Sequence, residues 1–176
     1  KDDMAKLQKN TEKYTALPAE VKTQVVVIGG GGSGLASAIA AQQAGAKVIV
    51  LEKLGLLGGS TNVSEGALNA ADPERQGKQG IEDSIQKHYD QTMKGGHDIG
   101  NPVLVHYLTD HALESVHWLE SIGVQFKPEV GTATGALWQR SHYPATPSGN
   151  TYIRSFEKYI NAHKEDIQVY TDMNAE

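Results

Sequence analysis

The sequence predicts an α/β fold built on a parallel sheet, and three observations support this prediction. A short run rich in β-branched residues, 24–28, ends at four consecutive glycines, as a buried strand of a parallel sheet does. An alanine-rich segment, 33–44, then carries apolar residues at helical spacing and stops at Gly45. A second apolar run, 47–51, follows at once. Strand, glycine turn, helix and strand within about thirty residues form a βαβ unit, whose two strands run parallel.

The remainder of the chain predicts four more helices and one more strand. Asn101 and Pro102 are typical of a helix start, and Gly123 is typical of its end. The buried face of this helix is expected to consist of Val105, Leu108, Ala112, Val116, Leu119 and Ile122. The other expected elements are helices over 81–93 and 151–163, a strand over 167–170, irregular segments over 55–80 and 127–150, and a leader helix over 2–16 within a leader or linker region, 1–23.

Composition excludes several classes of function. The 176 residues carry a formal net charge of −5, which argues against a general nucleic-acid binder. The chain has no cysteine, and therefore no disulfide, thiolate metal site or covalent haem attachment. No apolar run is long enough to span a membrane. Because the chain starts at Lys1, we expect that a segment upstream of it was removed.

Gly29, Gly31 and Gly34 form a G-x-G-x-x-G motif between the first strand and the first helix. The first glycine permits a tight turn, the second lets the backbone approach a pyrophosphate, and the third allows close helix–strand packing. Glu52 closes the second strand, at the spacing where a carboxylate accepts hydrogen bonds from ribose hydroxyls. An incidental glycine-rich turn is the alternative. The strand before the turn, the helix after it and the position of Glu52 all indicate dinucleotide binding instead.

The motif alone does not choose between FAD and NAD, because both contain adenosine and pyrophosphate. A second glycine turn, 57–61, follows Glu52 after a few residues. Nicotinamide dehydrogenases usually continue the sheet with a helix at this point, whereas glutathione-reductase-like flavoproteins fold the segment back along the pyrophosphate. The second turn therefore favours FAD.

Six segments between residue 24 and the C-terminus carry a family resemblance. They are VVVIGGGGSGLASAIAA, AGAKVIVLEK, GGSTNVSEGALNAA, TMKGGHDIGNPVLV, ESVHWLESIGV and EVGTATGALWQRSHYP. Together they resemble the fumarate reductase and succinate dehydrogenase flavoprotein family, and most of all its soluble flavocytochrome c fumarate reductases and urocanate reductases. The resemblance implies that residues 24–176 are the N-terminal part of a Rossmann-like, glutathione-reductase-like FAD-binding domain. This domain is expected to be incomplete, since the family's capping domain and C-terminal return segment are absent from the chain.

The resemblance also implies which residues contact cofactor and substrate. The residues expected to bind FAD are Gly29, Gly31, Ser33, Gly34, Glu52, Lys53, Gly59, Ser60, Thr61, Gly66 and Ala67. Those expected near the substrate are Gly66, Thr132 and Ala133. For Ser60 and Thr61, ordinary turn hydrogen bonding is the alternative.

Two departures from the family pattern concern the substrate. Glu65 stands where the relatives usually carry a small residue. Thr132 and Ala133 stand where the fumarate reductases tend to place methionines. These differences leave the cofactor prediction unchanged, but they put fumarate itself in doubt as the substrate.

By this resemblance the whole protein is a flavin-dependent oxidoreductase of anaerobic respiration. It would transfer a hydride from flavin N5 to the C=C bond of a small unsaturated carboxylic acid, such as fumarate or urocanate. One alternative is an FAD dehydrogenase or oxidase, such as a ketosteroid dehydrogenase or aspartate oxidase, and another is a non-catalytic nucleotide-binding fragment. The expected partners are the unsaturated carboxylate, an electron-donor domain or protein carrying haem or FMN, and the remainder of the polypeptide. We expect a bacterial periplasmic or other extracytoplasmic location, with the cytoplasm as alternative.

Few residues of the chain are candidates for chemistry of their own, and residues 1–176 alone are expected to be inactive. Arg140 and His142 lie in a loop that resembles a substrate-proximal loop of the family, where they would hold a carboxylate or donate a proton. Structural hydrogen bonds in a solvated loop are the equal alternative. His106, His111 and His117 share one helix at spacings that do not bring ligands together, so no metal site is expected.

Overall fold

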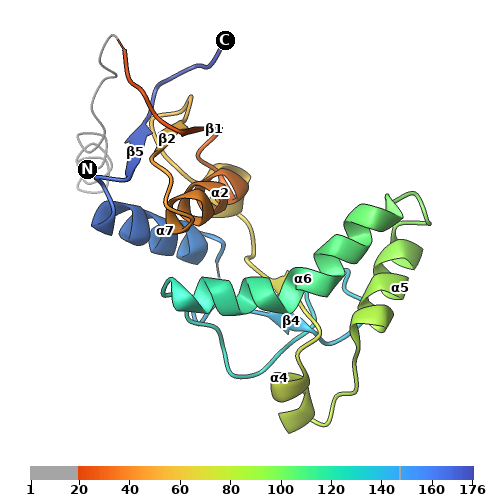
Figure 1. Ribbon diagram of the computed structural model, residues 1–176. Coiled ribbons are helices and arrows are strands. Elements are labelled where there is room, and N and C mark those ends of the chain that lie inside the picture. Colours follow the sequence, from red (N-terminus) through yellow and green to blue (C-terminus); the bar gives the residue numbers. More distant parts are fainter. Residues whose placement is uncertain (1–19, 147) are drawn as a thin grey trace, which may run out of the picture. The chain divides into compact units, whose positions relative to one another are not determined.

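The computed structural model describes residues 20–146 and 148–176 (Figure 1). The chain divides into two compact units, one made of Lys1–Ser64 with Tyr152–Glu176 and the other of Glu65–Thr151. The leader helix expected over 2–16 lies outside the described residues.

The first unit is built on a parallel sheet of three short strands. These strands are β1 (Val25–Ile28), β2 (Val48–Leu51) and β5 (Ile167–Tyr170), in the order β1-β2-β5. Both pairs are parallel, with Val25 opposite Val48 and Val48 opposite Ile167. The α/β fold, the βαβ unit and the strand over 167–170 are therefore confirmed.

The two long helices in the described part of this unit are α2 and α7. Helix α2 (Gly32–Gln43) buries Leu35, Ala38 and Ile39 and contacts all three strands. It ends as expected at Gly45, whose φ of 89° is in the left-handed region. Helix α7 (Asn150–Ala162) lies beside α2, because the Tyr159 hydroxyl donates a hydrogen bond of 2.9 Å to Oε1 of Gln42. Its buried residues are Tyr152, Ile153, Phe156 and Ile160.

One face of β1 is left open in the described part of the chain. Val26 is 54% exposed and Ile28 is 72% exposed, although parallel strands are normally covered on both faces. Within the described residues, β1 pairs only with β2.

The second unit combines helices with a small antiparallel sheet. Strands β3 (Leu68–Asn69) and β4 (Ser141–His142) pair with each other. The helices are α4 (Pro73–Lys78), α5 (Ile85–Gly95) and α6 (Pro102–Ser121), and α5 packs against α6. The core contains Ala70, Ala112 and Val116, with Leu68, Leu113 and Phe126 packed around them.

The predicted start and end of α6 are confirmed. Asn101 caps the helix by accepting hydrogen bonds from the backbone of Val103 and Leu104, and Gly123 has a φ of 100°. The predicted buried stripe is wrong at Leu108, which is 58% exposed. Thr109 lies in the interior instead of Leu108. The Thr109 hydroxyl can be buried because it donates hydrogen bonds to the carbonyls of Val105 and His106.

Two segments expected to be irregular contain short elements. The segment 55–80 forms α3 (Gly59–Asn62), β3 and α4, and the segment 127–150 contains β4. These elements have between two and six residues, which is too short to produce a hydrophobic period in sequence.

Some absences hold for the described part of the chain. No helix there is long and apolar enough to cross a membrane. No group of three metal-ligating side chains is found among the same residues, and His106, His111 and His117 are all exposed.

Candidate cofactor-binding site

The first glycine turn joins β1 to α2, and two of its glycines are required by the chain itself. Gly29 has a φ of 103°, a conformation that a residue with a side chain adopts only under strain. At Gly34, a Cβ atom would overlap the carbonyl oxygen of Gly29. The helix therefore packs closely on the strand, as the motif predicts.

Gly31 has no such internal reason to be glycine. Its φ of −79° and ψ of −176° suit any residue, and a Cβ atom there would meet nothing nearer than the Gly58 carbonyl oxygen at 3.9 Å. Gly31 is also the N-cap of α2, where no side chain caps the helix and no acidic residue lies in the first turn. An open backbone approach and the positive end of a helix dipole together suit a pyrophosphate.

Glu52 lies at the carboxyl end of β2 and is 7% exposed. One carboxylate oxygen accepts a hydrogen bond of 2.7 Å from the Gly30 backbone, and the other accepts one of 2.8 Å from the Leu54 backbone. Glu52 therefore ties the glycine turn to the segment after β2. Each carboxylate oxygen keeps a further lone pair for a ligand hydroxyl.

The second glycine turn lies against the first. The Gly58 amide donates a hydrogen bond of 2.8 Å to the Gly30 carbonyl, and Gly58 pairs with Gly31 in an isolated parallel bridge. Gly58 and Gly59 have φ values of 116° and 49°, so both positions favour glycine. The segment after Glu52 thus returns to the first turn, which agrees with the behaviour expected of a flavoprotein.

The structure brings together most of the residues predicted to bind FAD. The Thr61 side chain of the second turn lies near the first turn, because a Cβ atom at Gly32 would overlap it, and the Gly59 position lies next to Gly31. The residues of this set in the first unit are Gly29, Gly31, Ser33, Gly34, Glu52, Lys53, Gly59, Ser60 and Thr61. Ser33, Lys53 and Ser60 are exposed.

The remaining predicted residues belong to the second unit. Gly66 has a φ of 83°, and a Cβ atom there would overlap the backbone of Ser148 and Gly149. This packing explains its glycine within the chain. Ala67 is half-buried beside it.

The loop with Thr132 and Ala133 is fastened to β4. Gly131 and Ser141 exchange two backbone hydrogen bonds of 2.9 Å, and the Ala133 amide donates to the Ser141 hydroxyl at 2.9 Å. Thr132 is exposed and Ala133 is half-buried.

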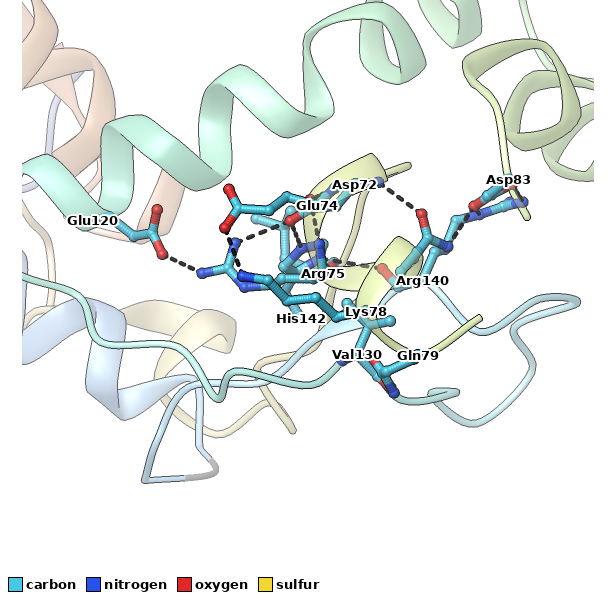
Figure 2. Close-up of polar contacts among 12 residues, drawn as sticks. Asp72, Glu74, Arg75, Lys78, Gln79, Asp83, Glu120, Val130, Arg140 and His142 are labelled. Carbon is cyan, nitrogen blue, oxygen red and sulfur yellow. Dashed lines mark hydrogen bonds and ion pairs between the residues drawn. The ribbon is translucent and has the colours of Figure 1, made fainter. Parts of the chain in front are cut away.

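Arg140 and His142, the candidates for chemistry, are both buried in a polar network of the second unit (Figure 2). Arg140 does hold a carboxylate bidentately, but that carboxylate belongs to Asp83 of the same chain, at 2.8 and 2.7 Å. The expectation of a solvated loop is wrong, because Arg140 is 3% exposed and His142 is fully buried.

Asp72 is the centre of the network that holds His142. Its Oδ1 accepts hydrogen bonds from the backbone of Glu74 and Arg75, and its Oδ2 accepts from Nη1 of Arg75 at 3.0 Å and Nε2 of His142 at 3.1 Å. Burial acts to raise the pKa of Asp72, but the hydrogen bonds from Arg75 and His142 lower it to about 2. Asp72 is therefore ionised at neutral pH.

Gln76 connects the two ends of this network. Its Oε1 accepts from the Asp72 backbone at 2.7 Å, and its Nε2 donates to Oδ2 of Asp83 at 2.8 Å. Sequence reasoning did not single out Asp72, Gln76 or Asp83. The sequence Asp72-Pro73-Glu74 is an N-cap signal that could have located α4.

A family model described as an FAD binding domain matches residues 24–176. The chain belongs to this FAD-binding family. The matched residues include both glycine turns, Glu52 and the whole second unit. FAD is therefore the cofactor that this domain binds, and the prediction of FAD over NAD is confirmed.

Curated relatives of the chain are reductases. Fumarate reductase (cytochrome) of Shewanella frigidimarina is 36% identical over 167 residues, which cover 95% of this chain and 29% of the relative. Urocanate reductase of Eggerthella lenta is 37% identical over 135 residues, or 76% of this chain and 22% of the relative. The chain thus spans less than a third of the length of these relatives.

A solved structure supports the same relationship. The open conformation of a flavocytochrome c3 fumarate reductase matches with a TM-score of 0.78 and 32% identity, over 96% of this chain and 29% of that one. A 3-ketosteroid dehydrogenase from Rhodococcus jostii matches with a TM-score of 0.71 at 23% identity, which shows a common fold alone.

Proposed function

We propose that the whole protein carrying this chain reduces the C=C bond of a small unsaturated carboxylic acid, fumarate- or urocanate-like, with FAD as the hydride donor. The observation that carries the proposal is the set of reductases of such acids, at 36% and 37% identity, among the relatives. Only a likeness of fold supports the ketosteroid dehydrogenase alternative. The intact glycine turn and Glu52 agree equally with a non-catalytic nucleotide-binding fragment, so the turnover assay decides between the two.

The residues of the first unit would hold the cofactor. The open backbone at Gly31 and the first turn of α2 would bind the pyrophosphate, and Glu52 would accept hydrogen bonds from the ribose hydroxyls. The exposed side chains of Ser33, Lys53 and Ser60 are free to reach a ligand at the same turn. Bound FAD supplies hydride transfer through its N5 atom.

The second unit would contribute to the substrate site rather than to proton transfer. We assign Gly66, Thr132 and Ala133 to the vicinity of the substrate, with Ala67 along the flavin. The internal partners of Arg140 and His142 support a positioning role for both, since their buried bonds fix β4 and the loop before it. The proton donor and the ligands of the substrate carboxylate would then lie in other parts of the whole protein.

The electron donor and the location belong to the same proposal. Reduction of an enoate requires two electrons, which would come from a haem- or FMN-carrying domain or protein outside this chain. A periplasmic or other extracytoplasmic location would suit a soluble respiratory reductase of this kind.

The test is a spectroscopic turnover assay on the whole protein. The purified protein should show oxidised flavin absorbance that bleaches with reduced viologen and returns when fumarate, urocanate or a related enoate is added. Saturated analogues of the same acids serve as controls and should leave the flavin reduced. A colourless protein that responds to NADH would contradict the flavin assignment, and a flavin that no enoate reoxidises would contradict the proposed reaction.

A further inference from the structure

A single serine hydroxyl fastens the loop that carries Thr132 and Ala133. The two backbone hydrogen bonds between Gly131 and Ser141 hold the start of this loop. The Ala133 amide is also fastened to β4, but its acceptor is the Ser141 hydroxyl rather than a backbone carbonyl, at 2.9 Å. Ser141 is fully buried, so water does not substitute for a lost bond there. The position of Ala133 therefore depends on a side chain.

The same hydroxyl reaches across the small sheet to β3. It donates a hydrogen bond of 2.6 Å to Oδ1 of Asn69, the residue that pairs with Ser141 in the sheet register. Because the Ala133 amide can only donate, the Ser141 oxygen accepts from it and keeps its own proton for Asn69. Asn69, Ser141 and the Ala133 amide thus form two hydrogen bonds in series, which we call the loop relay. Hydrogen bonds in series strengthen one another.

The loop relay connects two segments with different expected roles. Asn69 follows Ala67 by two residues, and Ala67 is expected to lie along the flavin. Thr132 and Ala133, at the other end, are expected to form a wall of the substrate pocket. This wall can shift relative to β3 only if a short bond of the loop relay breaks.

We propose that Asn69 and Ser141 are positioning residues that determine substrate specificity, a role that rests on the proposed reduction of enoates. Both act through the loop, because the Ser141 hydroxyl holds the Ala133 backbone and Asn69 fixes the direction of that hydroxyl. A wall that is held in place keeps the pocket at one width. The pocket then discriminates between enoates of different size.

Amide hydrogen exchange at Ala133 in the whole protein tests the loop relay without any enzyme activity. Ser141→Ala removes the acceptor of this amide, so its exchange should accelerate about tenfold, as expected for one lost buried hydrogen bond. Asn69→Leu should accelerate it as well, because the hydroxyl is then free to turn away. Asn69→Asp keeps an oxygen acceptor in the same place and should leave the exchange unchanged.

Steady-state kinetics with fumarate and urocanate test the role in specificity. Ser141→Ala and Asn69→Leu should raise KM for the preferred enoate about three- to tenfold, and the ratio of kcat/KM between the two enoates should move towards one. The value of kcat should change by less than about twofold, because the wall contacts the substrate rather than the reacting atoms. Structural damage alone would reduce the amount of active enzyme, which lowers kcat and leaves KM unchanged.

Ser84→Ala is the matched control in the second unit. The Ser84 hydroxyl also accepts from a backbone amide, that of Lys87 at 3.0 Å, where it caps α5. Its loss should lower the stability of the unit, as loss of a helix cap does. Exchange at Ala133, KM and the ratio between the two enoates should all stay as in the unaltered protein.

The possible failures can be told apart. An unaltered protein that reduces no enoate would overturn the proposed function, and the specificity role with it. Turnover by the unaltered protein, with KM unchanged in Ser141→Ala and Asn69→Leu, would overturn the specificity role alone. Equal acceleration of Ala133 exchange in Ser84→Ala and Ser141→Ala would also overturn it, because exchange would then follow stability. Asn69 is exposed, so Asn69→Leu decides the question even where Ser141→Ala does not fold.

Discussion

Within a single glycine motif, the reason for glycine differs from one position to the next. Gly29 is needed for its φ of 103° and Gly34 for the close approach of α2 to the strand. Gly31 has room for a side chain and an ordinary φ, so neither backbone conformation nor packing accounts for it. The space beside Gly31 is therefore the part of the turn that is kept open for a ligand.

Gly31→Val is expected to abolish FAD binding without unfolding the protein. The valine side chain would fill the approach to the pyrophosphate, whereas its Cβ atom would come no nearer to the folded chain than 3.9 Å, at the Gly58 carbonyl oxygen. The melting temperature of the flavin-free whole protein should change by no more than about 2 °C. Gly34→Val serves as the contrast, since its side chain would overlap Gly29 and should prevent folding. Calorimetry with FAD and thermal unfolding measure both effects.

Glu52→Gln is measured by the same calorimetry and thermal unfolding, and it should weaken FAD binding and lower the stability of the fold. Loss of the charged acceptor should lower FAD affinity about ten- to a hundredfold, as expected for charge-assisted hydrogen bonds. Because both oxygens accept from backbone amides, the new amide group would also face an N–H of Gly30 or Leu54. Glu165→Gln, at an exposed position, is the control. Equal FAD affinity in the wild type, Gly31→Val and Glu52→Gln would exclude this site.

The buried carboxylate of Asp72 is predicted to be a main source of stability in the second unit. Asp72→Asn removes the buried counter-charge of Arg75 and the carboxylate that Nε2 of His142 contacts, so it should lower the free energy of unfolding by about 3 kcal/mol. Glu74→Gln removes an exposed carboxylate from the same helix and should have no measurable effect. Urea unfolding of the whole protein, followed by a probe in the second unit, measures the difference.

The effect of Asp72 should depend on pH in a definite direction. Its pKa is about 2 in the folded chain and 3.8 ordinarily, so the ionised form stabilises the fold above pH 3.8. This contribution, about 2 kcal/mol, is lost as the pH falls through 2. The stability gap between the wild type and Asp72→Asn should be constant from neutral pH to about 5 and should narrow at lower pH. A gap that widens on acidification would contradict this assignment.

At the scale of elements, the sequence was informative where a hydrophobic period or a capping signal is long enough to read. Strands β1, β2 and β5 and helices α2, α6 and α7 were all expected near their observed bounds. Strands β3 and β4 were not expected, because two residues show no alternation. The contacts of the second unit were also beyond prediction, since His142 lies 70 residues from Asp72 and Arg140 lies 57 residues from Asp83.

Replacing each of two glycines at helices by alanine should change the stability of the protein in opposite directions. Gly45 ends α2 with a φ of 89°, so Gly45→Ala should destabilise the protein by about 1 kcal/mol through backbone strain alone. Gly77 lies within α4 without a positive φ, and a Cβ atom there would meet nothing within 4 Å. Gly77→Ala should therefore stabilise by about 0.5–1 kcal/mol. Chemical unfolding of both variants measures the pair, and effects of the same sign would show that backbone conformation does not decide them.

At the scale of the whole molecule, small side chains at Thr132 and Ala133 predict a preference for a bulkier substrate. We expect kcat/KM to be higher for a larger enoic acid, such as urocanate, than for fumarate. Thr132→Met and Ala133→Met should shift this preference towards fumarate, because methionine refills the pocket wall. Thr134→Met, at the next exposed threonine of the loop, is the matched control. A higher kcat/KM for fumarate than for every bulkier enoate would contradict the expectation.

The last prediction concerns residues 1–176 in isolation, which we expect to associate and to lack activity. Val26 and Ile28 expose apolar surface on one face of β1, and the helix α6 exposes Val103, Leu104, Tyr107 and Leu108 near its start. An open strand face and an exposed apolar helix surface each favour contact with other chains. If the chain is well folded, we expect a second chain or an oligomer to cover these residues.

Size-exclusion chromatography with intact mass spectrometry tests this prediction. The double variant Val26→Thr with Ile28→Thr should reduce association, because it makes the open face of β1 polar while keeping β-branched side chains in the strand. Val63→Thr is the control, since Val63 is 84% exposed but lies outside β1 and α6. A stable 18.9 kDa monomer that reduces enoates with reduced viologen would contradict the prediction, because it would mean that the open face of β1 needs no cover and that the chain itself supplies the proton donor.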